Sequence, residues 1–232
     1  LGSNSFDRCQ SLEDVAFESG SQVPNIPWYG FPGTAIKSIT LPASVQYIGF
    51  RAFSGCGSLT SVTFESGSQC TSIHQVAFEY AALTSITIPA SLTDLGPQAF
   101  LACTQLSSVE FEVGSQCSII QAEAFKLTAI ASISVPASVT SIERDVFSSC
   151  SSLTSVELSC ESSAIIHSDA FASSGLTSLS LPPRVFYTGS ISTSVKICPC
   201  PVGKYSSTGN DDVSCELCAA GYSTVGVSAV GS

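Results

Sequence analysis

Apolar residues recur along the chain in the order apolar-x-x-apolar-x-apolar, and this six-residue unit is repeated at a nearly constant interval. Successive units start 23 or 24 residues apart. A fixed period in this range is typical of repeat proteins, in which each unit packs only on its neighbours. The units begin at Leu12, Ile36, Leu59, Leu83, Leu106, Ile130, Leu153 and Leu176.

A stricter period of 47 residues lies beneath this one, because two kinds of unit alternate. Each unit also supplies one phenylalanine, so we predict a buried spine of Phe side chains that stabilises the array. The spine consists of Phe6, Phe53, Phe100 and Phe147 from one kind of unit, and of Phe31, Phe78, Phe125 and Phe171 from the other.

Each unit contains a short alternation of apolar and polar residues, such as Ile39-Thr40-Leu41. This pattern predicts one short strand per unit. The rest of a unit, as in Val45 to Cys56, is expected to pack its Ile, Ala and Phe against that strand. The predicted fold is a β-rich solenoid of eight rungs whose parallel strands stack about 4.8 Å apart.

The residues that follow the predicted strands also alternate. One kind of unit ends its strand with a proline, which has no N–H to continue a ladder: Pro42, Pro89, Pro136 and Pro182. The other kind has a glutamate followed by a glycine suited to a tight turn: Glu18 with Gly20, Glu65 with Gly67, and Glu112 with Gly114.

The segments L-T-S-I-T-I-P-A-S-L at 83–92 and A-F-L-A-C at 99–103 resemble the BspA-like leucine-rich repeat family. The resemblance covers about residues 1–190, which form the first predicted domain. It implies a leucine-rich repeat solenoid and a surface or adhesion protein. The Asn of other leucine-rich repeats is absent, so we expect Pro, Ser and Gly to hold the turns.

Residues 197–222 differ from the repeats and are predicted to form a second, cysteine-rich module, followed by a tail over 223–232. The stretch has few apolar side chains and four cysteines: Cys198, Cys200, Cys215 and Cys218. Disulfides normally replace the core in such a segment. A zinc site is the alternative, but the first pair is C-P-C rather than C-x-x-C, which is poor geometry for two ligands of one ion.

Two stretches of this module, C-P-V-G-K-Y-S and C-E-L-C-A-A-G-Y-S, resemble the ephrin-receptor-like (TNFR-like) cysteine-rich repeat. That resemblance implies an extracellular, disulfide-bonded module. Ala219 stands where the family usually has a proline.

The other seven cysteines belong to the repeats. Cys9, Cys56, Cys103 and Cys150 recur two rungs apart, too far for disulfides among themselves. Cys70 and Cys117 take the slot that Val23 fills, so we expect buried free thiols that act as small apolar side chains. The pairs 56 with 70 and 103 with 117 stay open as an alternative, and Cys160 lies outside the register.

The net charge of −10 argues against nucleic acid and anionic membrane as partners. No apolar run is long enough to span a bilayer, so no membrane insertion is expected. The chain starts at Leu1 without a leader and is interpreted as a fragment. No catalytic, phosphate-binding or zinc-protease motif occurs, so we expect neither an enzyme nor a cofactor. His74 and His167 are expected to face solvent without a catalytic role.

The outward positions of the predicted strands form two rows of small polar residues. Binding by a solenoid is usually spread over such an exposed face, although solubility alone also accounts for these rows. The candidate binding residues are Ser38, Thr40, Ser61, Thr63, Ser85, Thr87, Ser108 and Glu110. We expect contact to centre on the uncharged middle, Ser61 to Thr87, because carboxylates are costly to bury unpaired.

The three aligned glutamates Glu18, Glu65 and Glu112 suggest a calcium site, but successive members are about 10 Å apart and cannot share an ion. We expect them to form a solvated edge.

Three functions fit this sequence. The first is a non-catalytic extracellular or cell-surface recognition segment that binds a protein or glycan through the exposed solenoid face. An intracellular scaffold with reduced cysteines is the second. Ice or glycan binding by the hydroxyl rows is the third, although Glu110 and Glu157 interrupt the regular pattern that ice binding needs.

Overall fold

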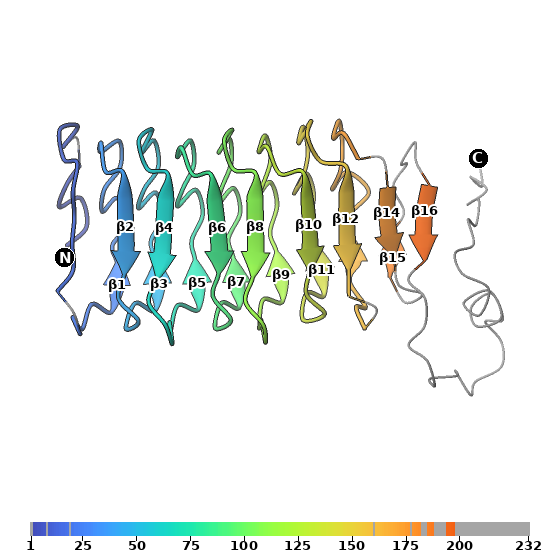
Figure 1. Ribbon diagram of the computed structural model, residues 1–232, viewed down its shortest axis with the longest axis horizontal. Coiled ribbons are helices and arrows are strands. Elements are labelled where there is room, and N and C mark those ends of the chain that lie inside the picture. The colour runs from blue at the N-terminus through green and yellow to red at the C-terminus, as the bar shows by residue number, and fades with distance from the viewer. Residues whose placement is uncertain are drawn as a thin grey trace.

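A computed structural model describes residues 2–7, 9–18, 20–159, 161–176, 178–181, 185–187 and 194–197. The chain forms an elongated solenoid in which successive turns lie side by side (Figure 1). All the strand pairs are parallel, as the repeat predicted. Two rows of strands enclose the core between them.

The first row, here called the long-strand row, consists of strands of four residues. From β2 to β10 their outward residues are exposed and their inward residues are buried or half-buried. The strands are β2 (Ser38–Leu41), β4 (Ser61–Phe64), β6 (Ser85–Ile88), β8 (Ser108–Phe111), β10 (Ser132–Val135), β12 (Ser155–Leu158), β14 (Ser178–Leu181) and β16 (Ser194–Ile197). Residues 14–17, where the repeat also predicts a strand, form none.

The second row was not predicted: each turn contributes a second strand of two residues rather than the single strand expected. These strands form one continuous eight-stranded sheet, here called the short-strand row. They are β1 (Asn25–Ile26), β3 (Tyr47–Ile48), β5 (Ser72–Ile73), β7 (Asp94–Leu95), β9 (Ile119–Ile120), β11 (Ser141–Ile142), β13 (Ile165–Ile166) and β15 (Phe186–Tyr187).

The predicted Phe spine is confirmed. Eight rings from Phe6 to Phe171 stack in chain order, with centroids 5.0–5.7 Å apart and planes within 10° of parallel. The six rings from Phe31 to Phe147 are fully buried. The stack therefore runs through the middle of the core that both strand rows cover.

The turn around each buried Phe contains residues in the left-handed backbone region, which costs about 1–2 kcal/mol for a residue with a side chain. Gly33 and Gly55 fill one such position in the first turns, but Tyr80, Ala102 and Leu127 fill it later. The expectation that Pro, Ser and Gly hold the turns is therefore incomplete. Main-chain bonds from turn to turn hold them instead, such as Phe53 N–H to the Ala77 carbonyl at 2.7 Å.

Five of the repeat cysteines are buried free thiols, as predicted. Three donate to the carbonyl of the preceding turn's Phe at 3.0–3.1 Å: Cys56 to Phe31, Cys103 to Phe78 and Cys150 to Phe125. Cys70 and Cys117 are free as well, so neither of the alternative pairs is present. The repeat cysteines that follow the register were predicted to be buried, but Cys9 is exposed. It lies in the first turn that the structure describes, which packs on a described neighbour on one side only. Cys160 lies outside the described residues.

Candidate functional site

The structure places all eight candidate binding residues on the outer face of the long-strand row. Each is exposed, and each lies on one of the neighbouring strands β2, β4, β6 and β8. Ser38 aligns with Ser61 and Thr40 with Thr63, while Ser85 aligns with Ser108 and Thr87 with Glu110. The two polar rows predicted from the sequence therefore exist as surface features.

The long-strand row is interrupted at two places. β2 pairs with β4, β6 with β8, and β10 with β12, whereas β4 does not pair with β6 and β8 does not pair with β10. From β2 to β14, steps of 23 residues separate the paired strands and steps of 24 the unpaired ones. The extra residue lies in the turn from β4 to β5, which holds seven residues against six from β12 to β13.

Proline accounts for part of this interruption. After β4, the Glu65 N–H donates to the Leu41 carbonyl of the preceding turn at 3.0 Å. Pro89 takes the equivalent position after β6 and has no N–H to offer the Phe64 carbonyl. Pro182 follows β14, which still pairs with β12 over three residues after a 23-residue step. A proline thus removes one bond. The other bonds between the strands themselves are absent where the step is 24, although just before β4 and β6 the Thr84 N–H still donates to the Thr60 carbonyl at 3.2 Å.

A groove of about 310 Å³ lies over the unpaired junction of β4 and β6. Hydroxyl groups from both strands line it, Val62 and Ile86 form its floor, and the half-buried Phe64 lies at the end of β4. The lining hydroxyl residues are Ser61, Thr63, Ser85 and Thr87. These are the four residues on which the sequence centred the predicted contact.

Glu112 is the charged residue of the groove lining. Its carboxylate accepts the Ala90 N–H at 2.8 Å, and Glu65 accepts the Ala43 N–H at 3.1 Å in the same way. The predicted solvated edge is therefore partly wrong, because these two carboxylates cap the turn that follows a proline in the preceding rung. Among the described residues no group of His, Cys, Asp or Glu could hold a metal ion.

Near the start of the long-strand row, the Lys37 ammonium lies 2.6 Å from the Glu13 carboxylate. The hydrogen bond and the opposite charge lower the pKa of Glu13 and raise the pKa of Lys37. Both side chains are exposed, so this pair stabilises the fold little. The pair does neutralise the charge of Lys37, which precedes the first exposed residue of β2.

The short-strand row carries aromatic residues that the sequence did not single out as a site. Trp28, Tyr47 and Phe50 come from the first two turns of this row, and His74 comes from the third. His74 is half-buried with its ring centroid 5.2 Å from Tyr47, so the expectation that it simply faces solvent is wrong. His167 is exposed, as expected.

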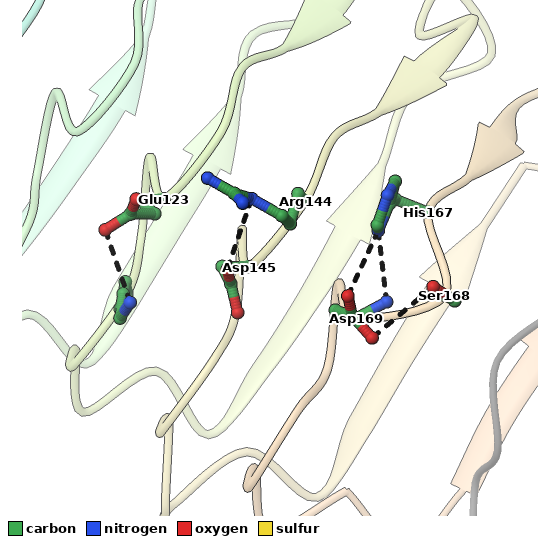
Figure 2. A network of polar contacts seen from close by, with 7 residues as sticks. Glu123, Arg144, Asp145, His167, Ser168 and Asp169 are labelled. Atoms are coloured by element: carbon green, nitrogen blue, oxygen red, sulfur yellow. Dashed lines mark hydrogen bonds and ion pairs between the residues drawn. The ribbon is translucent and has the colours of Figure 1, made fainter.

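Charged pairs occupy the later turns of the same row. Figure 2 shows Glu123, the Arg144–Asp145 pair and the His167–Asp169 pair on successive turns. Lys126 lies 3.3 Å from Glu123. The row is therefore aromatic near its start and charged further along.

Apart from Ile197, the last residue of β16, the predicted cysteine-rich module lies outside the described residues, as do its cysteines Cys198, Cys200, Cys215 and Cys218. Within the part of the chain that the structure does describe, no helix is long and apolar enough to cross a membrane.

A family model for the BspA type leucine-rich repeat region matches this chain in six copies, over residues 1–107, 24–154 and 71–194. The chain belongs to the BspA-type leucine-rich repeat family. The match covers both strand rows and the groove. No match was found among curated proteins.

Similar solved structures come from several bacteria. The pneumococcal vaccine antigen PcpA is 21% identical with a TM-score of 0.52, over 75% of this chain and 49% of that one. A leucine rich cell surface protein from Faecalibacterium prausnitzii is 23% identical with a TM-score of 0.44, over 79% and 70%. A leucine-rich repeat protein from Bacteroides ovatus is 19% identical with a TM-score of 0.47, over 82% and 78%. This BspA-type chain spans about half the length of the pneumococcal structure.

Proposed function

We propose that this BspA-type chain is a non-catalytic recognition or adhesion segment of an extracellular or cell-surface protein. It binds a protein or glycan through the long-strand row. The groove between β4 and β6 is the observation that carries this proposal, because binding sites are usually concave surfaces with a few convergent polar groups.

The groove suits a polar, extended partner. β4 and β6 do not pair as strands, so main-chain groups on their facing edges are open to water or to the hydroxyl groups of a sugar that enters the groove. The four hydroxyl side chains are neutral and cost less to desolvate than carboxylates. Glu112, with Glu110 on the adjoining strand, favours a neutral or partly basic partner over an acidic one.

The extracellular location rests on the predicted disulfide module and on the family. The similar pneumococcal structure is described as a vaccine antigen, which is consistent with a surface location here. An intracellular scaffold is the competing interpretation. Counting free thiols in the denatured protein, isolated from its natural source without added reductant, separates the two, because the proposal expects at least four of the eleven cysteines to be oxidised. Eleven free thiols would favour the scaffold.

The binding site is tested with the double variant Ser85→Arg and Thr87→Arg. Both residues are exposed, so the variant should fold normally, while its two long cations obstruct the groove. We expect at least a tenfold loss of binding to whichever matrix protein, mucin or neutral polysaccharide of an immobilised panel retains the unmodified chain.

The matched control is Ser132→Arg with Ser134→Arg, which alters the same two exposed positions one 47-residue period later, on β10. This control should bind like the unmodified chain. Equal loss in both double variants would mean that added charge, or the second interruption between β8 and β10, matters rather than this groove. Unchanged binding in both, with loss after changes at Glu65 and Glu112, would place the site on the turn edge instead.

A further inference from the structure

Five aromatic side chains form a connected group at the start of the short-strand row, here called the aromatic platform: Trp28, Tyr29, Tyr47, Phe50 and His74. The ring centroids of Trp28 lie 6.3 Å from Phe50 and 6.4 Å from His74. Tyr29 packs edge-on against Phe50 at 5.3 Å, and Tyr47 contacts His74 at 5.2 Å. Three successive turns therefore contribute to one surface.

The exposed ring of this platform is held in place from below. Trp28 is 52% exposed although it is a large aromatic residue. Its indole Cδ1 and its main-chain nitrogen lie within 2.7 Å of where a side chain on Gly49 would begin, so the absence of a Cβ at Gly49 makes room for the ring. The close approach of Gly49 thus fixes the position of the Trp28 indole, and the exposed side of this ring faces solvent.

The platform has little net charge. Among the described residues, the cation that adjoins the platform is Arg51, which lies over the Phe50 ring at 5.7 Å and 3.8 Å from the Glu79 carboxylate. The charged pairs of this row lie in later turns (Figure 2). Exposed Gln46 and Gln75 are next to Tyr47 and His74 in the chain and supply amide groups at the border of the platform. Exposed Thr71 adds a hydroxyl group there, because its side chain donates to the Gln46 carbonyl at 3.2 Å.

We propose that the aromatic platform is a binding site for neutral carbohydrate. A sugar ring has an apolar face whose C–H groups carry partial positive charge, and this face complements the negative face of the indole. Its hydroxyl groups need hydrogen-bond partners when they leave water, and the amide and hydroxyl side chains at the border offer them. Among the described residues a charged sugar would find no unpaired charge on the platform, because Arg51 lies beside the Glu79 carboxylate.

The size of the platform also favours a sugar over a protein. A stable protein interface buries about 800 Å² on each partner, whereas here one exposed indole stands among rings that are half-buried. The platform belongs to the short-strand row, and the core separates it from the groove over β4 and β6. The two sites can therefore be tested independently.

Trp28 is the single tryptophan of the chain, so its fluorescence reports directly on the platform. The test is a titration of the protein with four neutral hexasaccharides: cellohexaose, maltohexaose, mannohexaose and chitohexaose. At least one should change the Trp28 emission saturably with a dissociation constant of roughly 1 mM or tighter. In calorimetry, Trp28→Ala should weaken that binding by about tenfold or more.

Two controls keep the result specific. Tyr80→Ala removes another exposed aromatic ring that is not part of the platform and should bind normally. The groove variant with Arg at positions 85 and 87 should also bind normally, even if its own partner is lost. If no hexasaccharide changes the emission, or if Trp28→Ala binds as well as the unmodified chain, the proposal is wrong and the rings serve a protein contact or stability alone.

Discussion

Gly55 and Gly57 lie two residues apart in one turn, but only Gly55 has a positive φ, of 73°. A Cβ at either position would meet no heavy atom closer than 3.8 Å, so space does not distinguish them. We expect Gly55→Ala to lower the free energy of unfolding by about 1–2 kcal/mol, because only its backbone is left-handed. Gly57→Ala should leave it within about 0.5 kcal/mol or raise it slightly. Urea unfolding of both variants checks this, and equal effects would contradict the turn conformation.

The buried thiols predict a loss of stability in alkaline solution. Burial raises the pKa of Cys70, Cys103 and Cys117 from 9.0 to about 12. Between these values the folded chain keeps thiol protons that the unfolded chain releases. The free energy of unfolding therefore has its full value below pH 9 and falls as the pH rises toward 12, by about 1.4 kcal/mol per pH unit for each thiol.

Urea unfolding between about pH 9.5 and 11 measures this slope. The variant Cys70→Ala with Cys117→Ala removes two of the thiols and should show a slope shallower by about 2.7 kcal/mol per pH unit. Comparing slopes rather than absolute stabilities removes the cost of the small cavities that the alanines leave. Parallel slopes for the two proteins would show that these thiols are not protonated and buried in the folded state.

At the scale of single elements, the Phe stack couples each turn to the next. Phe100 lies between Phe78 and Phe125, with centroids 5.2 and 5.4 Å away. Phe100→Ala should lower the free energy of unfolding by about 3–5 kcal/mol. In a linear array the loss falls on two neighbouring interfaces, so unfolding should split into two transitions.

Calorimetry or urea unfolding followed by fluorescence and circular dichroism detects this splitting. The half-buried neighbour Leu101 is outside the stack, and Leu101→Ala should keep a single transition. A single cooperative transition for Phe100→Ala would mean that the stack does not couple the two halves.

The elements that could be predicted from the sequence are those whose residue pattern recurs in every repeat unit. The elements without such a recurring pattern were not predicted. The Phe stack could be predicted because each repeat unit has one Phe at the same position, and residues at equivalent positions of a solenoid occupy the same place in the core. The second strand row escaped because segments such as Tyr47–Ile48 are too short to show alternation. The aromatic platform escaped because Trp28, Tyr47 and His74 do not share one slot and meet only across turns.

The groove shows the same limit at the site itself. The exposure of Ser61 to Thr87 followed from alternation, and Pro89 was visible as a residue without an N–H. The opening between β4 and β6 depends on how a 24-residue step displaces one turn from the next. The spacing of residues along the chain does not reveal how far one turn is displaced from the next. The groove could therefore be found only from the structure.

At the scale of the whole molecule, the core is continuous while the long-strand row is not. The Phe stack and the short-strand row run without a break through the turns that they join. The long-strand row opens twice, once at the proposed binding site. A rigid core with an interrupted face lets the chain keep unpaired strand edges at its centre without loss of the fold.

The interruption between β4 and β6 is tested most directly by amide hydrogen exchange of the free protein. β12 is paired on both sides, whereas β6 is paired on one. We expect about half of the β6 amides to exchange quickly while those of β12 stay protected, because a strand edge without a neighbour leaves its N–H groups to water. If the array simply frayed from its ends, the amides of β12 would exchange faster than those of β6, because β6 lies nearer the middle. Equal or greater protection of β6 would mean that the junction is closed in solution, and the groove would then not exist.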